Sequence, residues 1–253
     1  MTKYQTPLFL RHDWKSKLFS KPFAYFSSIY PLIRLIERQK KVGKLLEIGC
    51  GTGQFLYMMQ QRDWDCQGLE MSADATIFCR ETYSLNVQEG AVEDTNYEPN
   101  TFDVIVLSHV LEHLYNPHKV LEKLKAWLTP EGIIVLTIPN GKSWTAAYFK
   151  QYWSGYDVPR HYYTFTSSSL RKLAEKNGLD FRYCRTIYGS HSGIQTSLLI
   201  MDQVYPENFW LQLLSSLLRN PLVTLILLPI HWIIDQLGLG EALTCVFSNK
   251  TAS

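Results

Sequence analysis

The chain has 253 residues, of which 46% are hydrophobic and 19% are charged, and its formal net charge is +2. This length suits one α/β domain with insertions as well as two small domains, and we expect one domain. The nearly neutral balance gives no basic surface of the kind that nucleic-acid-binding proteins carry. The composition therefore argues against a nucleic-acid partner.

The cysteines are five in number, widely spaced and without a C-x-x-C pair: Cys50, Cys66, Cys79, Cys184 and Cys245. Most lie in or beside apolar runs, which is typical of a reduced protein without a cysteine-based zinc site. The beginning of the chain lacks the apolar segment of a signal peptide, and no apolar stretch reaches the roughly 20 residues that span a bilayer. We therefore expect a cytoplasmic protein, either soluble or peripheral at the inner membrane face.

The chain divides into an aromatic and basic N-terminal cap at residues 1–40 and one larger domain at residues 41–253. In the larger domain, short apolar strands alternate with amphipathic segments, the pattern of a parallel sheet wound with helices. Strands are predicted at 44–49, 66–70, 86–90, 102–108, 132–138, 181–187 and 242–248. Helices are predicted near 32–38, 53–62, 72–82, 117–127 and 167–177. A helical, apolar insertion is expected at about 190–238, before the last strand.

Part of this insertion, residues 209–234, is too apolar for a solvated loop. Pro221 and Pro229 should break it into two short helices. Such helices could lie in a membrane interface, with Trp210 and Trp232 at headgroup depth. An equally good interpretation is that they cover the sheet or form the interface of a homo-oligomer.

A glycine-rich turn follows the first strand of the larger domain, with alternate glycines at Gly49, Gly51 and Gly53. Missing side chains let the backbone turn sharply and approach a ligand, and free N–H groups at the following helix favour a carboxylate or phosphate. Glu70 ends the second strand about 20 residues downstream, where a carboxylate can accept hydrogen bonds from both ribose hydroxyls. Together these features predict a nucleotide-like cofactor.

The spacing of the turn and one acidic residue distinguish between cofactor classes. A dinucleotide site has G-x-G-x-x-G, whereas the glycines of this turn are separated by single residues. Glu47, just before the first glycine, would repel a pyrophosphate but could bind the cationic amino group of a methionine moiety.

The segment Leu46–Gly53 resembles motif I of class I S-adenosylmethionine-dependent methyltransferases, Glu70 resembles their second motif, and Thr101–His113 resembles their fourth-strand motif. Within that superfamily, Leu111–His113 and Pro159–Thr166 are similar to a branch that includes ubiquinone-type O-methyltransferases and bacterial glycan-pathway methyltransferases. The resemblance implies a Rossmann-like, doubly wound sheet of seven strands with the last strand antiparallel. It also implies S-adenosylmethionine as the cofactor.

The same resemblance implies that Glu47, Gly49 and Gly51 hold the methionine end of the cofactor, Glu70 the ribose, and residues 91–93 the adenine. Many relatives have an acid where this chain has Ala91, so the adenine would rely on backbone groups and Glu93. The complete set of expected cofactor residues is Glu47, Gly49, Cys50, Gly51, Gly53, Glu70, Met71, Val92, Glu93, Ser108 and His109.

Histidines near these motifs are candidates for chemistry, because methylation of a hydroxyl requires alignment and removal of its proton. We predict His161, in the loop after the fifth strand, as the catalytic base. The alternative is a structural histidine bonded to the backbone. His109, Glu112 and His113 would share a helical face, and some quinone O-methyltransferases bind a divalent metal near this region. We expect instead that Glu112 and His113 brace the loop, and we assign no metal.

Other side chains near His161 have two interpretations each. Arg160 either contacts an anionic substrate group or pairs with Asp157, and the neighbouring tyrosines either line the acceptor site or pack beneath it: Tyr156, Tyr162 and Tyr163.

The sequence favours an S-adenosylmethionine-dependent methyltransferase that acts on a small or lipid-linked acceptor, such as a sugar or a quinone precursor, at a hydroxyl oxygen. An RNA methyltransferase that modifies a tRNA wobble base is one alternative, although it would want a basic patch. A cofactor-binding scaffold without catalysis is another. The acceptor pocket is built from variable loops, so the fold alone does not identify the acceptor.

Overall fold

The computed structural model describes residues 22–188, 191–218 and 220–250. The strands are β1 (Lys44–Ile48), β2 (Asp65–Glu70), β3 (Asn86–Glu89), β4 (Phe102–Ser108), β5 (Leu128–Pro139), β6 (Leu179–Tyr188) and β7 (Ala242–Asn249). The helices are α2 (Pro22–Gln39), α3 (Gln54–Gln60), α4 (Ala73–Tyr83), α5 (Pro117–Trp127), α6 (Trp144–Phe149), α7 (Ser167–Lys176), α8 (His191–Val204), α9 (Phe209–Leu218) and α10 (Pro221–Gln236), with short 3-10 turns η1 (Leu111–His113), η2 (Lys150–Tyr152) and η3 (Ser154–Tyr156).

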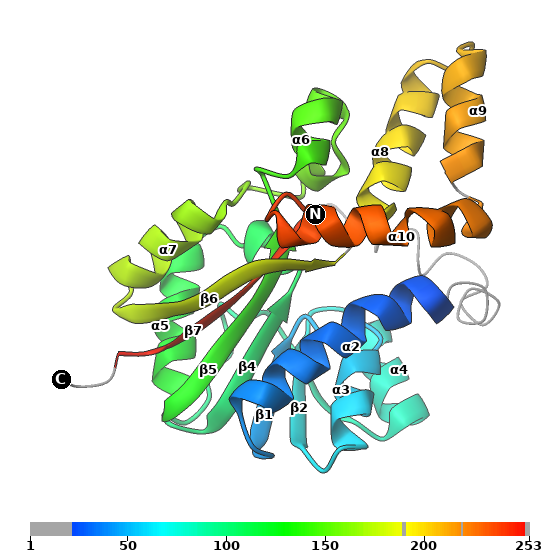
Figure 1. Cartoon of the computed structure of the whole chain (residues 1–253). Coiled ribbons are helices and arrows are strands. Elements are labelled where there is room, and N and C mark those ends of the chain that lie inside the picture. Colours follow the sequence, from blue (N-terminus) through cyan, green and yellow to red (C-terminus); the bar gives the residue numbers. More distant parts are fainter. Residues whose placement is uncertain (1–21, 189–190, 219, 251–253) are drawn as a thin grey trace.

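The strands form one seven-stranded sheet in the order β3-β2-β1-β4-β5-β7-β6 (Figure 1). Strands β1 to β5 pair in parallel, and β7 runs antiparallel to both β5 and β6. This architecture confirms the predicted Rossmann-like sheet with an antiparallel last strand. Because parallel strands end at one edge, the residues that follow β1, β2, β4 and β5 gather at the same side of the sheet.

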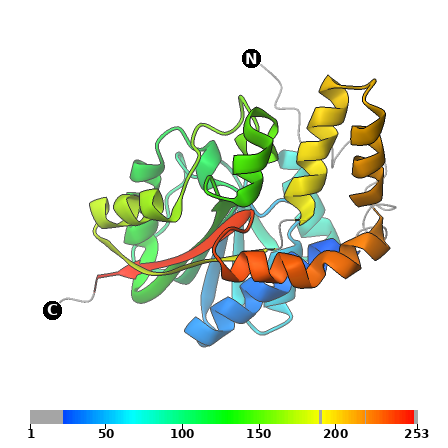
Figure 2. The ribbon, with the colours of Figure 1, turned by 45° about the horizontal axis from the view of Figure 1, so that its top comes forward.

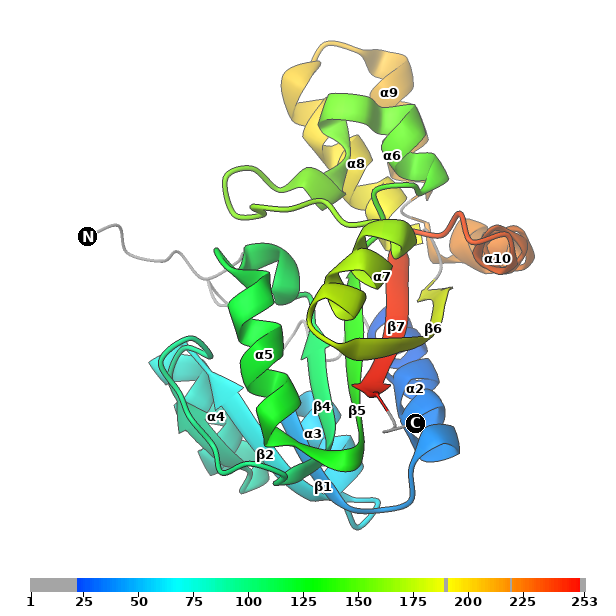
Figure 3. The same ribbon diagram turned by 90° about the vertical axis from the view of Figure 1, so that its left-hand side faces the viewer.

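Helices cover both faces of the sheet, as Figure 3 shows from the side. One core cluster joins α5 and α7 to one face, and a second joins α2, α3 and α4 to the other. Successive residues of β4 alternate between them, with Val106 in the second cluster and Leu107 in the first. This burial on both faces explains why β4 and β5 are apolar without alternation.

Three helices, α8, α9 and α10, occupy the connection between β6 and β7. Figures 1 and 2 show α8 and α9 side by side beyond the carboxyl edge of the sheet, with α10 crossing near the sheet. Pro221 begins α10, as expected of a residue without a backbone N–H. The prediction that Pro229 also breaks the segment is wrong, because α10 continues through it. Among the described residues, no helix is long and apolar enough to cross a membrane.

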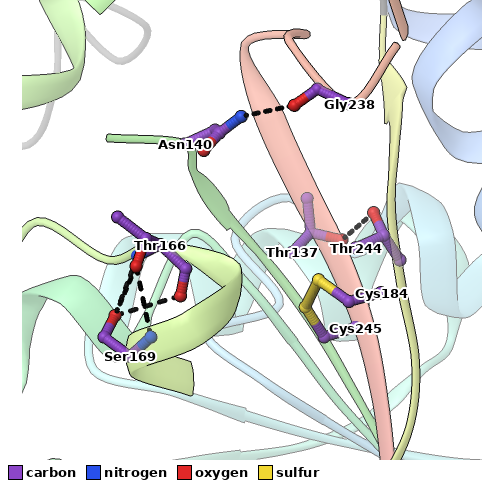
Figure 4. Close-up of a disulfide and its surroundings, with 8 residues drawn as sticks. All are labelled: Thr137, Asn140, Thr166, Ser169, Cys184, Gly238, Thr244 and Cys245. Atoms are coloured by element: carbon purple, nitrogen blue, oxygen red, sulfur yellow. Dashed lines mark hydrogen bonds between the residues drawn. A yellow bond between two sulfur atoms is a disulfide. The ribbon is translucent and has the colours of Figure 1, made fainter. Parts of the chain in front are cut away.

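The expectation that all the cysteines are reduced is wrong for one pair. Cys184 and Cys245 are opposite each other on β6 and β7 and form a disulfide, with their Cα atoms 4.0 Å apart (Figure 4). The two residues are 61 positions apart in the sequence, so only strand pairing brings them together. Cys50, Cys66 and Cys79 are free and buried.

The aromatic and basic residues predicted to begin the N-terminal cap, residues 1–21, lie outside the described residues. The helical part of the cap is longer than the predicted 32–38 and forms α2. Its apolar side chains belong to the second core cluster: Ile29, Leu32, Ile33, Leu35 and Ile36. This helix therefore covers one face of the sheet as a layer of the main fold.

Candidate active site

The glycine-rich turn lies between β1 and α3, and all its glycines have left-handed backbone angles. The φ values are 68° at Gly49, 55° at Gly51 and 72° at Gly53. A β-carbon at Gly53 would lie 2.7 Å from both Cys79 Sγ and Leu85 Cδ1, so this glycine is required by packing. A β-carbon at Gly51 would meet nothing within 4 Å, so its backbone faces open space where a ligand can approach.

The Glu70 carboxylate closes this turn from the end of β2. Its two oxygens accept hydrogen bonds from the backbone N–H groups of Gly51, at 2.8 Å, and Ser72, at 2.9 Å. Ser72 in turn caps α4. The carboxylate predicted to clamp the ribose is thus held at the carboxyl edge beside Gly51, with lone pairs left for a further donor.

Glu47, at the end of β1, is a buried acid with unused hydrogen-bonding capacity. Its side chain is 5% exposed, and Oε2 has no hydrogen-bond partner within the described part of the chain. Burial, followed by the nearby Cys79 and Glu70, holds the pKa of Glu47 well above its usual range. A desolvated carboxyl group beside the open Gly51 is suited to receive a cation, so the residues present fit the ammonium group of a methionine-derived cofactor.

Cys50 was predicted to contact the cofactor, but its side chain packs beneath the turn. A β-carbon at Gly68 would lie 2.9 Å from Cys50 Sγ, and Cys50 is 8% exposed. A hydrogen bond with Cys79 and burial raise the pKa of the Cys50 thiol. Cys79 Sγ also donates to the carbonyl oxygen of Gly51 at 3.2 Å, so both thiols brace the turn from below.

The segment predicted to contact adenine follows β3 and is held against α5. Lys123 Nζ donates to the carbonyl oxygens of Val92, at 3.2 Å, and Glu93, at 2.6 Å. Val92 is buried, whereas the side chains of Glu93 and Met71 are exposed. Lys123 was not among the predicted site residues, because the contact spans about 30 positions and no local motif marks it.

Ser108 ends β4, and His109 follows it beside the glycine turn. The backbone N–H of His109 bonds to the carbonyl oxygen of Thr137 on β5, at 2.8 Å, and His109 has a left-handed φ of 55°. Its Nδ1 lies 3.3 Å from Oε1 of Glu112, a side chain that is 1% exposed. The structure therefore brings His109 and Glu112 together, but not on the predicted helical face, because the helical turn is limited to Leu111–His113 and His109 lies outside it.

His161 lies beside this cluster, and one backbone contact fixes the orientation of its ring. Its Nδ1 is 2.8 Å from the carbonyl oxygen of Gly155. A carbonyl oxygen only accepts, so Nδ1 carries the proton and the neutral ring leaves Nε2 with its lone pair. Nε2 lies 3.9 Å from Oδ2 of Asp157, and the side chain is 9% exposed.

His113 packs edge-on against His161, with ring centroids 4.5 Å apart. Its Nδ1 donates to the carbonyl oxygen of Arg160 at 3.0 Å. Glu112, His113 and His161 each offer a ligand atom, and these atoms all lie within 4.8 Å of one another. The cluster thus also has the donor set and spacing that a divalent cation requires.

The loop that carries His161 is docked on the segment after β4. The backbone N–H of Tyr162 donates to the carbonyl oxygen of Glu112 at 2.9 Å, and the rings of Tyr115 and Tyr162 stack with centroids 4.1 Å apart. Tyr163 donates its hydroxyl to the carbonyl oxygen of Tyr115 at 3.0 Å. Arg160 pairs with Asp157 at 2.6 Å, so the second of its two interpretations describes the structure.

Comparison with known families decides the class of this site. A family model described as a methyltransferase domain matches residues 26–183, more than half of the chain. The chain belongs to this methyltransferase family. It is therefore an S-adenosylmethionine-dependent methyltransferase.

Individual relatives agree with this assignment. Over 107 residues the methyltransferase is 33% identical to the ubiquinone biosynthesis O-methyltransferase of Glaesserella parasuis serovar 5, a match that covers 38% of this chain and 45% of that protein. The match thus spans less than half the length of this relative.

Solved structures share the fold at low sequence identity. A methyltransferase from Archaeoglobus fulgidus has a TM-score of 0.61 at 15% identity and covers 93% of this chain and 99% of its own. A chain from the Haloferax volcanii complex of the Trm112 methyltransferase activator with a methyltransferase has a TM-score of 0.62 at 12% identity, covering 95% and 96%.

Proposed function

We propose that this methyltransferase transfers the methyl group of S-adenosylmethionine to a hydroxyl oxygen of a small or lipid-linked acceptor, such as a sugar or a quinone precursor. The observation that carries the proposal is the orientation of His161, whose Nδ1 is bonded to the Gly155 carbonyl so that Nε2 is free to take a proton. The name of the Glaesserella relative, an O-methyltransferase, supports the choice of oxygen.

In this proposal the donor is held by the residues around the glycine turn. Glu47 pairs with the ammonium group, Gly51 lets the backbone approach, and Glu70 accepts from the ribose hydroxyls. Val92 and Glu93 flank the adenine. The cofactor supplies an electrophilic methyl group on a positively charged sulfur.

Nε2 of His161 would take the proton of the acceptor hydroxyl, which makes that oxygen a better nucleophile. The bound cofactor would supply the methyl group and would keep the electron pair of its methyl–sulfur bond. The imidazolium that forms is stabilised by Asp157, whose Oδ2 is 3.9 Å from Nε2. Loss of that proton to solvent returns the ring to its neutral form.

The apolar surface of α9 and α10 favours an acceptor presented by a lipid surface. Trp210 is 74% exposed and Trp232 is 63% exposed. Other large apolar side chains are exposed on the same helices: Phe209, Leu213, Leu214, Leu217, Leu222, Leu225, Ile226, Ile230 and Ile233. Between Glu207 and Asp235 the sequence has one arginine and no acid, so nothing there repels an anionic leaflet. Helices of this kind lie in the plane of the interface.

The first experiment is a calorimetric titration of the protein with S-adenosylmethionine, repeated on Glu47→Ala and Glu70→Ala. Saturable binding that both variants lose is expected. No binding to folded wild-type protein, with or without anionic liposomes, would contradict the donor site.

The second experiment measures transfer of radiolabelled methyl groups to polyprenyl phenols and polyprenyl-phosphate-linked sugars in liposomes, with tRNA as a separate arm. His161→Asn should lower the rate about 10²–10⁴-fold, the usual contribution of a general base. His118→Asn, on the outer face of α5 next to Glu122, is the matched control. Labelling of tRNA alone would favour the RNA alternative, and no labelling in any arm would favour the scaffold.

A chelator separates the base from a metal site in the same assay. EDTA should leave the transfer rate unchanged if His161 acts as a base. A loss that Mg²⁺ or Zn²⁺ restores would instead assign Glu112, His113 and His161 to a metal ion.

A further inference from the structure

A partly buried carboxylate, Glu241, lies where three segments meet just before β7. Its Oε1 accepts a hydrogen bond from the indole Nε1 of Trp153 at 2.6 Å, and its Oε2 accepts from the hydroxyl of Thr145. Burial raises the pKa of Glu241, while the hydrogen bonds from Thr145 and Trp153 and the nearby His109 oppose that rise. Neither hydrogen bond involves the glycine turn, so the Glu241 side chain is held by Thr145 and Trp153 rather than by that turn.

The indole that Glu241 holds lies against the backbone that orients His161. Trp153 is 1% exposed, and a β-carbon at Gly155 would collide with its six-membered ring. The position of the Gly155 peptide is therefore set by the indole. The carbonyl oxygen of Gly155 is the group that receives Nδ1 of His161 at 2.8 Å. Glu241, Trp153, Gly155 and His161 form one continuous series of contacts.

Helix α8 contacts both Glu241 and the segment that follows Trp153. The backbone N–H of Ser154 donates to Oγ of Ser197 at 3.0 Å, and Ser154 Oγ donates to the carbonyl oxygen of Gly193 at 3.4 Å. A β-carbon at Gly193 would collide with the Glu241 carboxylate, so the helix backbone packs directly on it. The 153–155 segment is thus held between Glu241 and α8.

We propose that Glu241 is a positioning residue that fixes the tautomer and orientation of His161 through Trp153 and the Gly155 carbonyl. Removing a carboxylate from water costs more free energy than burying an apolar side chain of similar size. The Glu241 carboxylate offers the indole N–H a hydrogen-bond acceptor, which an apolar side chain cannot do. The inference takes the role of His161 from the proposed function, but its test requires no acceptor.

The test is the ¹⁵N NMR spectrum of the histidine side chains in the full-length protein, with His161 assigned by comparison with His161→Asn. In wild type, Nδ1 should be protonated and Nε2 unprotonated at a pH above the pKa of the ring. In Glu241→Leu the ring should populate both tautomers. Glu241→Gln should restore the wild-type pattern, because its amide oxygen can accept from Trp153 and its amide group can donate to Thr145.

Two further variants separate positioning from general damage to the fold. Trp153→Phe removes the indole N–H together with the outer ring atoms that lie against Gly155, so it should change the His161 spectrum in the same direction as Glu241→Leu. Thr145→Val removes the other hydrogen bond of Glu241 and should leave that spectrum unchanged. Titration with S-adenosylmethionine should give wild-type affinity in all of these variants, because the donor side is intact.

A wild-type His161 spectrum in both Glu241→Leu and Trp153→Phe, with cofactor binding retained, would overturn the proposal. If Glu241→Leu does not fold, Trp153→Phe alone decides. Failure to find any methylated acceptor would count against the proposed function, but it would not affect the NMR result on the His161 tautomer. With an acceptor in hand, Glu241→Leu should lower kcat at least tenfold and shift its pH profile, while the KM for the cofactor stays within twofold of wild type.

Discussion

The proposed site has a donor side, around the glycine turn, and an acceptor side, around His161. The contacts that build these two sides join residues at different separations along the sequence. On the donor side, Glu70 reaches Gly51 across 19 positions, and the glycine turn is a continuous segment. On the acceptor side, Trp153 reaches Glu241 across 88 positions and Asn140 reaches Gly240 across 100. The donor side is thus a local motif that many proteins can share, whereas the acceptor side depends on the particular insertion that this chain carries between β6 and β7.

The largest effect on cofactor affinity is expected from Glu47→Gln, which should bind S-adenosylmethionine about 100-fold more weakly, as expected when a buried charge-assisted hydrogen bond of roughly 2–3 kcal/mol is lost. In wild type, affinity should fall as pH falls through the raised pKa of Glu47, because the ammonium group pairs with the ionised form. The variant should lack this pH dependence. Calorimetry over a pH series measures both.

The same substitution should stabilise the protein without cofactor. Because the pKa of Glu47 is raised in the folded state, the protein loses stability as the pH rises above the pKa that this group has in the unfolded chain. Glutamine does not ionise, so the variant avoids this loss. We expect Tm at neutral pH to rise by about 2–4 °C for each kcal/mol of relieved cost. A lower Tm would mean that Glu47 supports the fold, which contradicts a role confined to the ligand.

A smaller effect on the donor side is expected from Gly51→Ala. The methyl group would stand in the open space at this turn, so affinity for the cofactor should fall about tenfold, as one steric clash of roughly 1–2 kcal/mol predicts. Gly238→Ala is the matched control, since Gly238 also has a positive φ, 72°, and open space around it. Both variants should lose about 1–2 kcal/mol of stability, the cost of a left-handed alanine, but only Gly51→Ala should lose affinity. Equal affinities would show that Gly51 does not face the cofactor.

The separation of contacting residues along the sequence also explains which features the sequence predicts and which it does not. The strands and the glycine turn follow from apolar runs and from residues near one another in the chain, and the structure confirms the sheet they form. The roles of the segment 144–155 and of Lys123 were missed, because their partners lie on distant elements. The Cys184–Cys245 disulfide was missed for the same reason, and Pro229 was taken as a helix break although α10 accommodates it.

On the acceptor side, the apolar face of α9 and α10 gives a prediction about lipid. Trp210→Ser combined with Ile226→Ser should weaken partitioning into anionic liposomes about fivefold or more, since the two exposed side chains together would lose about 1 kcal/mol of burial or more. Val42→Ser, an exposed apolar residue next to β1 and outside the insertion, is the control. Flotation with liposomes measures the effect. If wild-type protein elutes as a dimer in gel filtration and does not bind liposomes, this face would instead be the interface with a second copy of the chain.

The smallest effect is expected from Arg160→Gln, which separates the two sides most directly. The Arg160–Asp157 pair is partly exposed, so its loss should cost less than about 1 kcal/mol of stability. Affinity for S-adenosylmethionine should not change, because no described contact joins this loop to the glycine turn. The freed Asp157 would then face only Nε2 of His161, 3.9 Å away. The imidazolium should still be stabilised by Asp157, so the rate of methyl transfer should change only slightly. If cofactor affinity falls together with the transfer rate, the two sides are coupled, and the separation by contact range does not hold for function.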